Sequence, residues 1–208
     1  MIPEHENVLA EQVAVAAETL LSGGVVAFPT DTVYGLGALY DNSKAVRRIF
    51  DIKGRERTKA LPLIVANRNQ LEDVACSERA CVVLLMQAFW PGPLTLVLPK
   101  TKRVGCDVTG GLDTVAVRMP DHPVALMLAI RAGGAICATS ANISGREASL
   151  TACEVERQLG SSVDYIIRCD AVGSGIPSTI IDATGDKIRI IREGTITREK
   201  ISRICEIF

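Results

Sequence analysis

The chain has 208 residues, of which 48% are hydrophobic and 23% charged, a composition typical of a globular protein rather than a disordered one. Its formal net charge of −1 argues against a general nucleic-acid-binding protein, which usually has a basic surplus. No apolar stretch approaches the roughly 18 residues that span a bilayer, and residues 1–6 do not begin a signal peptide, so we expect a soluble cytoplasmic protein without membrane contact.

Hydrophobic periodicity predicts helices and strands that are mixed along the whole chain. The first helix is expected at 6–22, and the second runs from Ser43, as its cap, to about Ile52, with Gly54 after its end. Further helices are predicted at 78–88, from Pro123 onward, at 152–159 and at 197–207. Strands are predicted at 25–28, 61–66, 94–98, 114–118, 135–139, 163–167, 179–182 and 188–192. This order predicts one α/β domain over residues 1–208, a mixed twisted sheet flanked by helices with no additional C-terminal domain.

Two cations interrupt the apolar pattern of their elements. The buried stripe of the second helix includes Ile49 and Phe50, and helical spacing continues it to Lys53. Strand alternation places Arg192 on the same face as Ile190. Because burial of an unpaired cation costs free energy, each must extend to water, find an acidic partner or face an anion. The loop that begins at Lys53 holds four cations within seven residues. This clustering favours the third possibility, that Lys53 faces an anionic ligand.

Arg118 lies on a strand face that has room for a ligand. Thr114, Ala116 and Arg118 share this face, and the first two have small side chains. The planar fork of Arg binds a carboxylate or a phosphate at two points. A structural ion pair of Arg118 with Asp121 or Asp31 is the alternative, and the residues alone leave both open.

Common catalytic and phosphate-binding motifs are missing. There is no Gly-x-x-x-x-Gly-Lys-Ser/Thr loop, no Gly-x-Gly-x-x-Gly and no Gly-x-Ser-x-Gly; the Gly-rich segments 34–37 and 173–175 match turns better. The seven cysteines include no Cys-x-x-Cys pair, and His5 and His122 are too few for a metal cluster. We therefore predict no disulfide framework and no metal held by protein ligands, only a local anion site.

Seven blocks of the sequence occur in the order found in one known family. They are FPTDTVYGLG (28–37), KGR (53–55), WPGPLT (90–95), TVAVRMPDHP (114–123), TSANISG (139–145), PSTIID (177–182) and IREG (191–194). With these blocks the chain resembles the YrdC-like family, the threonylcarbamoyl-AMP synthases of the TsaC type, over a core of about residues 10–195. The resemblance implies the YrdC-like α/β twist as the fold.

The resemblance also implies a reaction. A nucleotidyltransferase of this family would join L-threonine, bicarbonate or CO2, and ATP with its Mg²⁺ into L-threonylcarbamoyladenylate and pyrophosphate. A partner threonylcarbamoyl transferase complex would then modify ANN-decoding tRNAs, while weak tRNA or RNA contact by this chain stays open. The alternatives are an RNA-binding or ribosome-maturation module that uses a basic concave surface, and the carbamoyl-transfer domain of hydrogenase maturation. The 4% aromatic content argues against the first and the lack of Cys pairs against the second.

Position by position, the resemblance implies two sets of site residues. The catalytic tetrad at the nucleotide is Lys53, Arg55, Ser140 and Asn142, with Thr114 and Arg192 as further ATP contacts. The threonine site is formed by Thr32, Arg118, Ser178 and the backbone of Ala138. The chain departs from the family where many relatives carry a threonine-contacting His, because Ile64 stands there. It also ends before the C-terminal domain whose linker covers the site in longer relatives.

Overall fold

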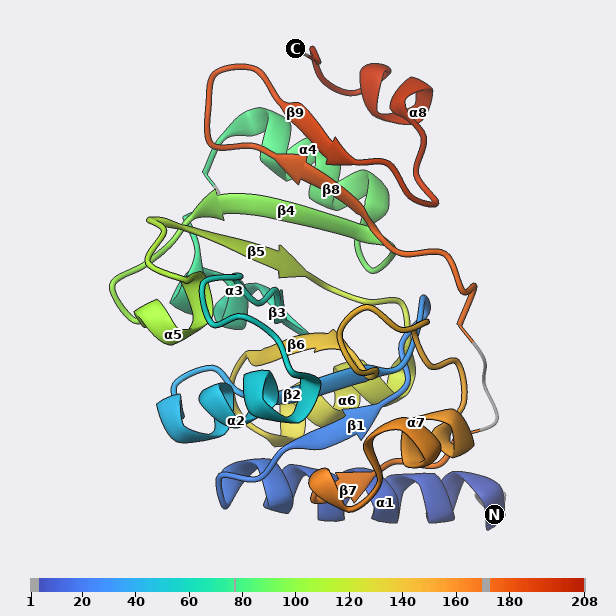
Figure 1. Ribbon diagram of the computed structural model, residues 1–208. Coiled ribbons are helices and arrows are strands. Elements are labelled where there is room, and N and C mark those ends of the chain that lie inside the picture. Colours follow the sequence, from blue (N-terminus) through green and yellow to red (C-terminus); the bar gives the residue numbers. More distant parts are fainter. Residues whose placement is uncertain (1–3, 77, 170–172, 208) are drawn as a thin grey trace.

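A computed structural model describes residues 4–76, 78–169 and 173–207 of the chain (Figure 1). The strands are β1 Val26–Phe28, β2 Gly35–Leu39, β3 Leu63–Ile64, β4 Leu94–Pro99, β5 Thr114–Arg118, β6 Ile136–Ser140, β7 Tyr165–Ile166, β8 Thr179–Asp182 and β9 Arg189–Arg192. They form one mixed sheet in the order β7-β1-β2-β6-β3-β5-β4-β8-β9, which confirms the predicted mixed α/β fold. None of the described helices is long and apolar enough to span a membrane.

Helices lie along the sheet from one end to the other. They are α1 Glu4–Leu21, α2 Ser43–Lys53, α3 Arg68–Val74, α4 Ala80–Phe89, α5 Cys106–Thr109, α6 Pro123–Arg131, α7 Ala152–Leu159, the 3-10 turn η1 Gly160–Ser162 and α8 Arg198–Ser202. Figure 1 shows α1 beside β7 at one end of the sheet and α8 beside β9 at the other. The predicted bounds of α7, β5 and β8 are confirmed, most other elements are shorter than predicted, and α3, α5 and β2 have no predicted counterpart.

The cap of α2 differs from the prediction by one residue. Asn42, not Ser43, is the N-cap, and its Oδ1 accepts a hydrogen bond from the Ala45 N–H at 3.1 Å. Asn and Ser are comparable caps, so the sequence pattern could not choose between two adjacent candidates. Gly54 ends the helix as predicted, in the left-handed region at φ 60°.

β2 is a central strand where the sequence predicted a turn at 34–37, so that prediction was wrong. The strand pairs with β1 on one side and β6 on the other. A Cβ atom at Gly37 would lie 2.7 Å from Ile136 Cγ2 and 2.8 Å from the carbonyl oxygen of Cys137. Gly37 therefore allows neighbouring strands to approach each other closely, and it does not form a turn.

Gly37→Ala should lower the free energy of unfolding by about 1–3 kcal/mol, because the added methyl group overpacks the sheet. Urea unfolding of the purified variant measures the change. Gly134→Ala is the matched control, because its Cβ would meet only Leu39 and Tyr40 side-chain atoms at 3.8 and 3.9 Å. We expect it to cost at most about 0.5 kcal/mol, and equal losses in the two variants would contradict this explanation.

The two faces of the sheet are covered differently. On one face, α1 and α6 pack over residues of β1, β3 and β6, including Phe28, Ile64 and Ile136. The opposite face holds the larger core with α2, α4 and α7. On the first face, Thr114 and Ala116 of β5 lie outside the α1–α6 core and are only half-buried. Arg118, the strand partner of Ile64, also lies on this face, whereas Lys53 belongs to α2 on the opposite face.

Candidate functional site

Lys53 ends α2 as a buried cation, with 2% of its surface exposed, as helical spacing predicted. Its Nζ donates to the carbonyl oxygen of Ser140, to that of Asn142 at 2.5 Å and to Asn142 Oδ1 at 3.3 Å. Among the described residues no carboxylate acts on its pKa. Burial, and then the charge of Arg55, lower the pKa of Lys53 from 10.5 to about 8. A buried ammonium group held only by neutral oxygens is suited to an anionic ligand.

Arg55 is the second cation of this cluster. Its Nη2 donates to the carbonyl oxygen of Ala60 at 3.2 Å, whereas its buried Nε has no hydrogen-bond partner within the described part of the chain. Burial lowers the pKa of Arg55. The other two cations of the loop, Arg57 and Lys59, form exposed ion pairs with surface carboxylates instead. Only half of the predicted cationic loop therefore faces the site.

The loop after β6 holds the lysine in place. Asn142 is 6% exposed, and its Nδ2 donates to the carbonyl oxygens of Ile143 and Arg146 at 2.9 and 2.8 Å. With the amide nitrogen engaged in this way, Oδ1 is turned toward Lys53. Ser140 is the last residue of β6 and accepts from the same ammonium group. The structure thus brings Lys53, Ser140 and Asn142 together, as the resemblance implied.

Arg118 ends β5 with 7% of its surface exposed, and protein groups take up three of its donors. Nη2 forms an ion pair with Asp31 Oδ1 at 2.5 Å, Nη1 donates to Thr32 Oγ1 at 2.8 Å, and Nε donates to the carbonyl oxygen of Gly92 at 3.0 Å. Of the two acidic partners considered from the sequence, Asp31 is therefore the observed one. Burial lowers the pKa of Arg118 and the charge of Asp31 raises it. The guanidinium remains a cation, since an arginine does not lose its proton in a protein.

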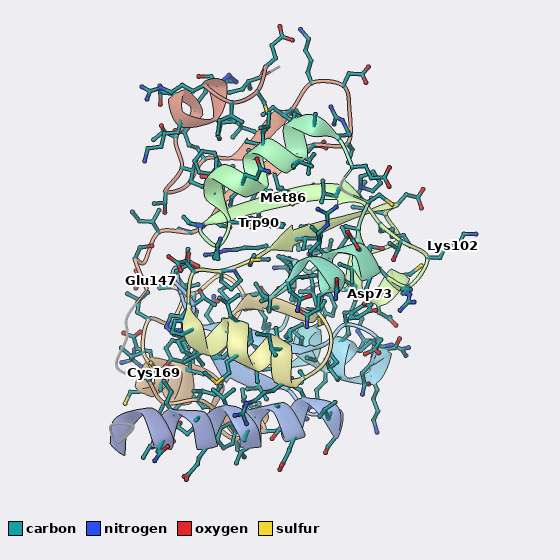
Figure 2. All side chains as sticks on the ribbon, turned by 180° about the vertical axis from the view of Figure 1, so that it is seen from behind. Asp73, Met86, Trp90, Lys102, Glu147 and Cys169 are labelled. Carbon is teal, nitrogen blue, oxygen red and sulfur yellow. The ribbon has the colours of Figure 1, made fainter. Side chains whose placement is uncertain are left out.

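The turn after α4 presents Gly92 to this arginine. Trp90 follows the end of α4 (Figure 2), and its Nε1 donates to the carbonyl oxygen of Leu94 at 2.7 Å. The Gly92 N–H donates to the carbonyl oxygen of Met119 at 2.8 Å, next to Arg118 in the chain. The WPGPLT block therefore has a structural role, the support of the Arg118 guanidinium.

A bulge moves Arg192 to the other face of its strand. Ile181 pairs with Ile190, but a register shift makes Arg192 the partner of Ile180. Adjacent residues of β8 point to opposite faces, so their partners Ile190 and Arg192 do so too, and the predicted alternation was wrong. From its new face Arg192 donates twice to the carbonyl oxygen of Ser178, at 2.8 and 3.2 Å.

The other residues of the predicted threonine site surround Arg118. Thr32 contacts it directly. Ser178 Oγ hydrogen-bonds Thr95 Oγ1 at 2.8 Å, and Thr95 is the cross-strand partner of Arg118. The charge of Arg192 acts on the pKa of Arg118, so these two guanidinium groups are neighbours. Thr95 is absent from the predicted set, although its position in the WPGPLT block, opposite the TVAVR strand, could have indicated it.

Three further positions singled out from the sequence lie on β3, β5 and β6. Thr114 lies four residues before Arg118 on the same face, half-buried. Ala138 lies on β6, where its N–H donates to the carbonyl oxygen of Pro62 at 2.8 Å. Ile64 is the cross-strand partner of Arg118, so the position at which the chain departs from the family does lie beside this arginine.

The segment 28–37 links the two clusters. Thr32 contacts Arg118, while the carbonyl oxygen of Tyr34 accepts from the Ala141 N–H at 2.8 Å, between Ser140 and Asn142. No group of three or more His, Cys, Asp or Glu that could hold a metal ion occurs in the residues that the structure covers. The arrangement offers two adjoining sites, one with unneutralised cations and one with a buried guanidinium ringed by hydroxyl groups.

Comparison with known proteins decides the family. The family model named Sua5_yciO_yrdC, described as telomere recombination, matches residues 18–194. The chain belongs to the Sua5/YciO/YrdC family. Its recognition from seven sequence blocks is thereby confirmed.

Several threonylcarbamoyl-AMP synthases resemble this family member over most of its length. The threonylcarbamoyl-AMP synthase of Bacillus subtilis (strain 168) is 42% identical over 93% of this chain and 56% of that protein. The threonylcarbamoyl-AMP synthase of Idiomarina loihiensis is 39% identical over 83% of this chain and 94% of that protein. The chain thus spans just over half the length of the Bacillus protein but nearly all of the Idiomarina protein.

Solved structures agree with the sequence comparison. The crystal structure of Pyrococcus abyssi Sua5 complexed with L-threonine has a TM-score of 0.91 and 40% identity, covering 96% of this chain and 59% of that one. Escherichia coli YciO has a TM-score of 0.83 and 26% identity, covering 92% of this chain and 93% of that one. The fold of this Sua5/YciO/YrdC domain therefore matches these two structures over more than nine-tenths of this chain.

Proposed function

We propose that this chain is a threonylcarbamoyl-AMP synthase. It converts L-threonine, bicarbonate or CO2, and ATP into L-threonylcarbamoyladenylate and pyrophosphate, with water as a further product when bicarbonate is used, which makes it a nucleotidyltransferase. The names of the Bacillus and Idiomarina relatives, and the L-threonine in the Pyrococcus Sua5 structure, support this reaction. The observation that carries the proposal is the buried, unneutralised Lys53 beside Arg55, one short loop away from the Arg118 cluster.

The cationic cluster is suited to the nucleotide. A carbamate oxygen attacks the α-phosphorus of ATP, the bond to the β-phosphate oxygen breaks, and pyrophosphate leaves with its electron pair. Negative charge grows in this transition state, and fixed cations in a water-poor site stabilise it strongly. We assign this role to Lys53 and Arg55, with Ser140 and Asn142 holding the lysine. Thr114 and Arg192 are assigned as further ATP contacts, and Mg²⁺ arrives with ATP as part of the substrate.

The Arg118 cluster is suited to the amino acid. Three N–H groups of Arg118 hold protein oxygens and two remain for a carboxylate. The hydroxyl groups of Thr32 and Ser178 lie next to it and can hydrogen-bond threonine, with the backbone of Ala138 nearby in the sheet. Much of the rate would then come from positioning, since two adjoining sites hold the reacting groups together.

The proposed product is a mixed anhydride, whose threonylcarbamoyl group must be transferred to an acceptor. We therefore propose a partner threonylcarbamoyl transferase complex that uses it to modify ANN-decoding tRNAs. Direct tRNA or RNA contact by this chain would at most be weak, because the chain has a formal net charge of −1. Since the reaction uses ATP and its product is used to modify tRNA, we assign this protein to the cytoplasm.

Pyrophosphate release from Mg·ATP tests the proposal. We expect release only when L-threonine and bicarbonate are both present, together with an adenylate of the expected mass. Pyrophosphate release that does not depend on L-threonine would contradict the synthase reaction. No release, combined with salt-dependent RNA binding, would favour the RNA-binding alternative.

The affinity for ATP should fall as the pH rises above about 8. In the free protein the pKa of Lys53 is about 8, so its charge is complete below this pH and is lost above it. Bound phosphates favour the charged form, so the Kd for ATP should increase by up to about tenfold per pH unit until the pKa of the complex is reached.

Isothermal titration calorimetry between pH 7 and 9.5 measures this dependence. Lys53→Arg is the control, because a guanidinium keeps its charge over the whole range. We expect weaker but nearly pH-independent binding in this variant. The same pH profile in both proteins would show that a group other than Lys53 titrates.

A further inference from the structure

His122 is a buried imidazole that the proposed reaction does not yet use. It lies four residues after Arg118, is 7% exposed and caps the N-terminus of α6. Its Nδ1 accepts the N–H of Val124 at 3.3 Å, so this nitrogen carries a lone pair and no proton. In a neutral imidazole the proton must then be on Nε2. Nε2 is buried and has no hydrogen-bond partner in residues 4–76, 78–169 and 173–207.

The environment of His122 keeps it neutral. Burial lowers its pKa, and the opposing charges of Asp31 and Asp121 do not outweigh burial. Its Nε2–H is therefore a single neutral donor without an acceptor, a state that costs free energy in a folded protein. Asp31 also forms the ion pair with Arg118, so the imidazole and the guanidinium share the field of one carboxylate. His122, the N-cap of α6, also follows Arg118, the last residue of β5, by only four residues, and this short connection keeps the orphaned donor near the Arg118 cluster.

We propose that the Nε2–H of His122 donates to a CO2⁻-type oxygen of the substrate, bound beside Arg118. The proposal rests on the proposed function, in which L-threonine brings such a group as its carboxylate and bicarbonate as the precursor of the carbamate. Arg118 has only two N–H groups to spare, so a third donor is useful for an anion with several lone pairs. The nine-residue helix α6 also directs the positive end of its dipole toward its N-cap.

A neutral donor has an advantage at this position. Arg118 and Arg192 are already close enough for the charge of one to lower the pKa of the other. A third cation would raise that repulsion, whereas a neutral Nε2–H adds a directed hydrogen bond without adding charge. The cap on Val124 fixes the tautomer, in the way that a second partner commonly fixes the proton on an imidazole.

Two substitutions separate substrate binding from capping. His122→Asn keeps an acceptor for the Val124 N–H, because Asn is a favoured N-cap, but its shorter side chain has no donor at the position of Nε2. We expect a melting temperature like that of the wild type and a Kd about tenfold higher for the ligand that His122 contacts. His122→Gln gives up the cap but can offer an amide N–H near the position of Nε2, so it should melt earlier and bind better than His122→Asn. Wild-type affinity in His122→Asn would overturn the proposal.

An NMR experiment identifies the ligand. The chain has two histidines, so His5→Gln with ¹⁵N-labelled histidine leaves one imidazole to observe. At pH 7.5 the long-range ¹H–¹⁵N spectrum should show the neutral Nε2–H tautomer. L-threonine and bicarbonate are then added separately and together, and backbone amide spectra are recorded alongside. A shift of Nε2 with threonine alone assigns its carboxylate, and a shift that requires bicarbonate assigns the bicarbonate or carbamate group.

The controls distinguish this proposal from the proposed function. If threonine shifts the amides of Thr32 and Arg118 while Nε2 does not respond to either ligand, the His122 proposal is overturned and the synthase proposal stands. If the protein also releases no pyrophosphate and no amide responds, both are overturned. A spectrum of the Nδ1–H tautomer would overturn the His122 proposal before any ligand is added.

Discussion

Lys53→Ala should lower the rate of threonine-dependent pyrophosphate release by about 10²- to 10³-fold. This is the usual cost of removing one fixed group that stabilises charge in a transition state. Lys53 fits that role because it is 2% exposed, is held by neutral oxygens and has a lowered pKa, all of which keep it ready for an anion. Initial rates at saturating ATP, L-threonine and bicarbonate measure the loss.

Stability controls are needed because Lys53 also supports the loop after β6. Its removal leaves the carbonyl oxygen of Asn142 without a donor and that of Ser140 with the Asn142 N–H alone, which should cost about 1–3 kcal/mol in the free energy of unfolding. Lys53→Met fills most of the same volume and separates packing from charge. Lys59→Ala is the matched surface control, since this lysine only pairs with Glu56 in solvent. A folded Lys53→Met variant with the wild-type rate would remove Lys53 from the nucleotide site.

The part of the fold that was predictable is the part set by local periodicity. α7 begins with Thr151 as N-cap in a capping box with Glu154, and its amphipathic pattern ends at Gly160, so its bounds could be read directly. β2 could not be read in this way. Its Gly37 is present because Ile136 and Cys137, about a hundred residues later, come too close for a side chain. Such a long-range contact leaves no periodic pattern near Gly37.

In the site, too, local patterns were predictive and long-range contacts were not. The burial of Lys53 followed from its position on the helical stripe, because that stripe is local. Arg192 was placed on the wrong face because a bulge depends on the partner strand, which the sequence of β9 does not reveal. Asp31 was only one of two candidate partners for Arg118, since 87 positions separate them along the chain. The seven blocks of the family brought these distant residues together, which periodicity alone could not do.

Arg118→Ala should remove threonine-dependent turnover and lower the free energy of unfolding by about 3–5 kcal/mol. The second effect arises because Asp31, with 15% of its side chain exposed, would be left buried without its cation. Loss of activity in this variant alone would therefore not separate a substrate contact from a structural ion pair. Urea unfolding, together with pyrophosphate release as a function of L-threonine concentration, measures both effects.

The double variant Arg118→Ala/Asp31→Asn separates them. A neutral amide at position 31 no longer needs a cation, so the double variant should regain much of the lost stability while its threonine-dependent turnover remains absent. Asp31→Asn alone keeps the guanidinium and should still respond to threonine, with a changed KM. If the double variant recovered the wild-type KM and kcat, Arg118 would be a structural partner of Asp31. The carboxylate of threonine would then have to be held by other donors, such as Thr32, Ser178 and His122.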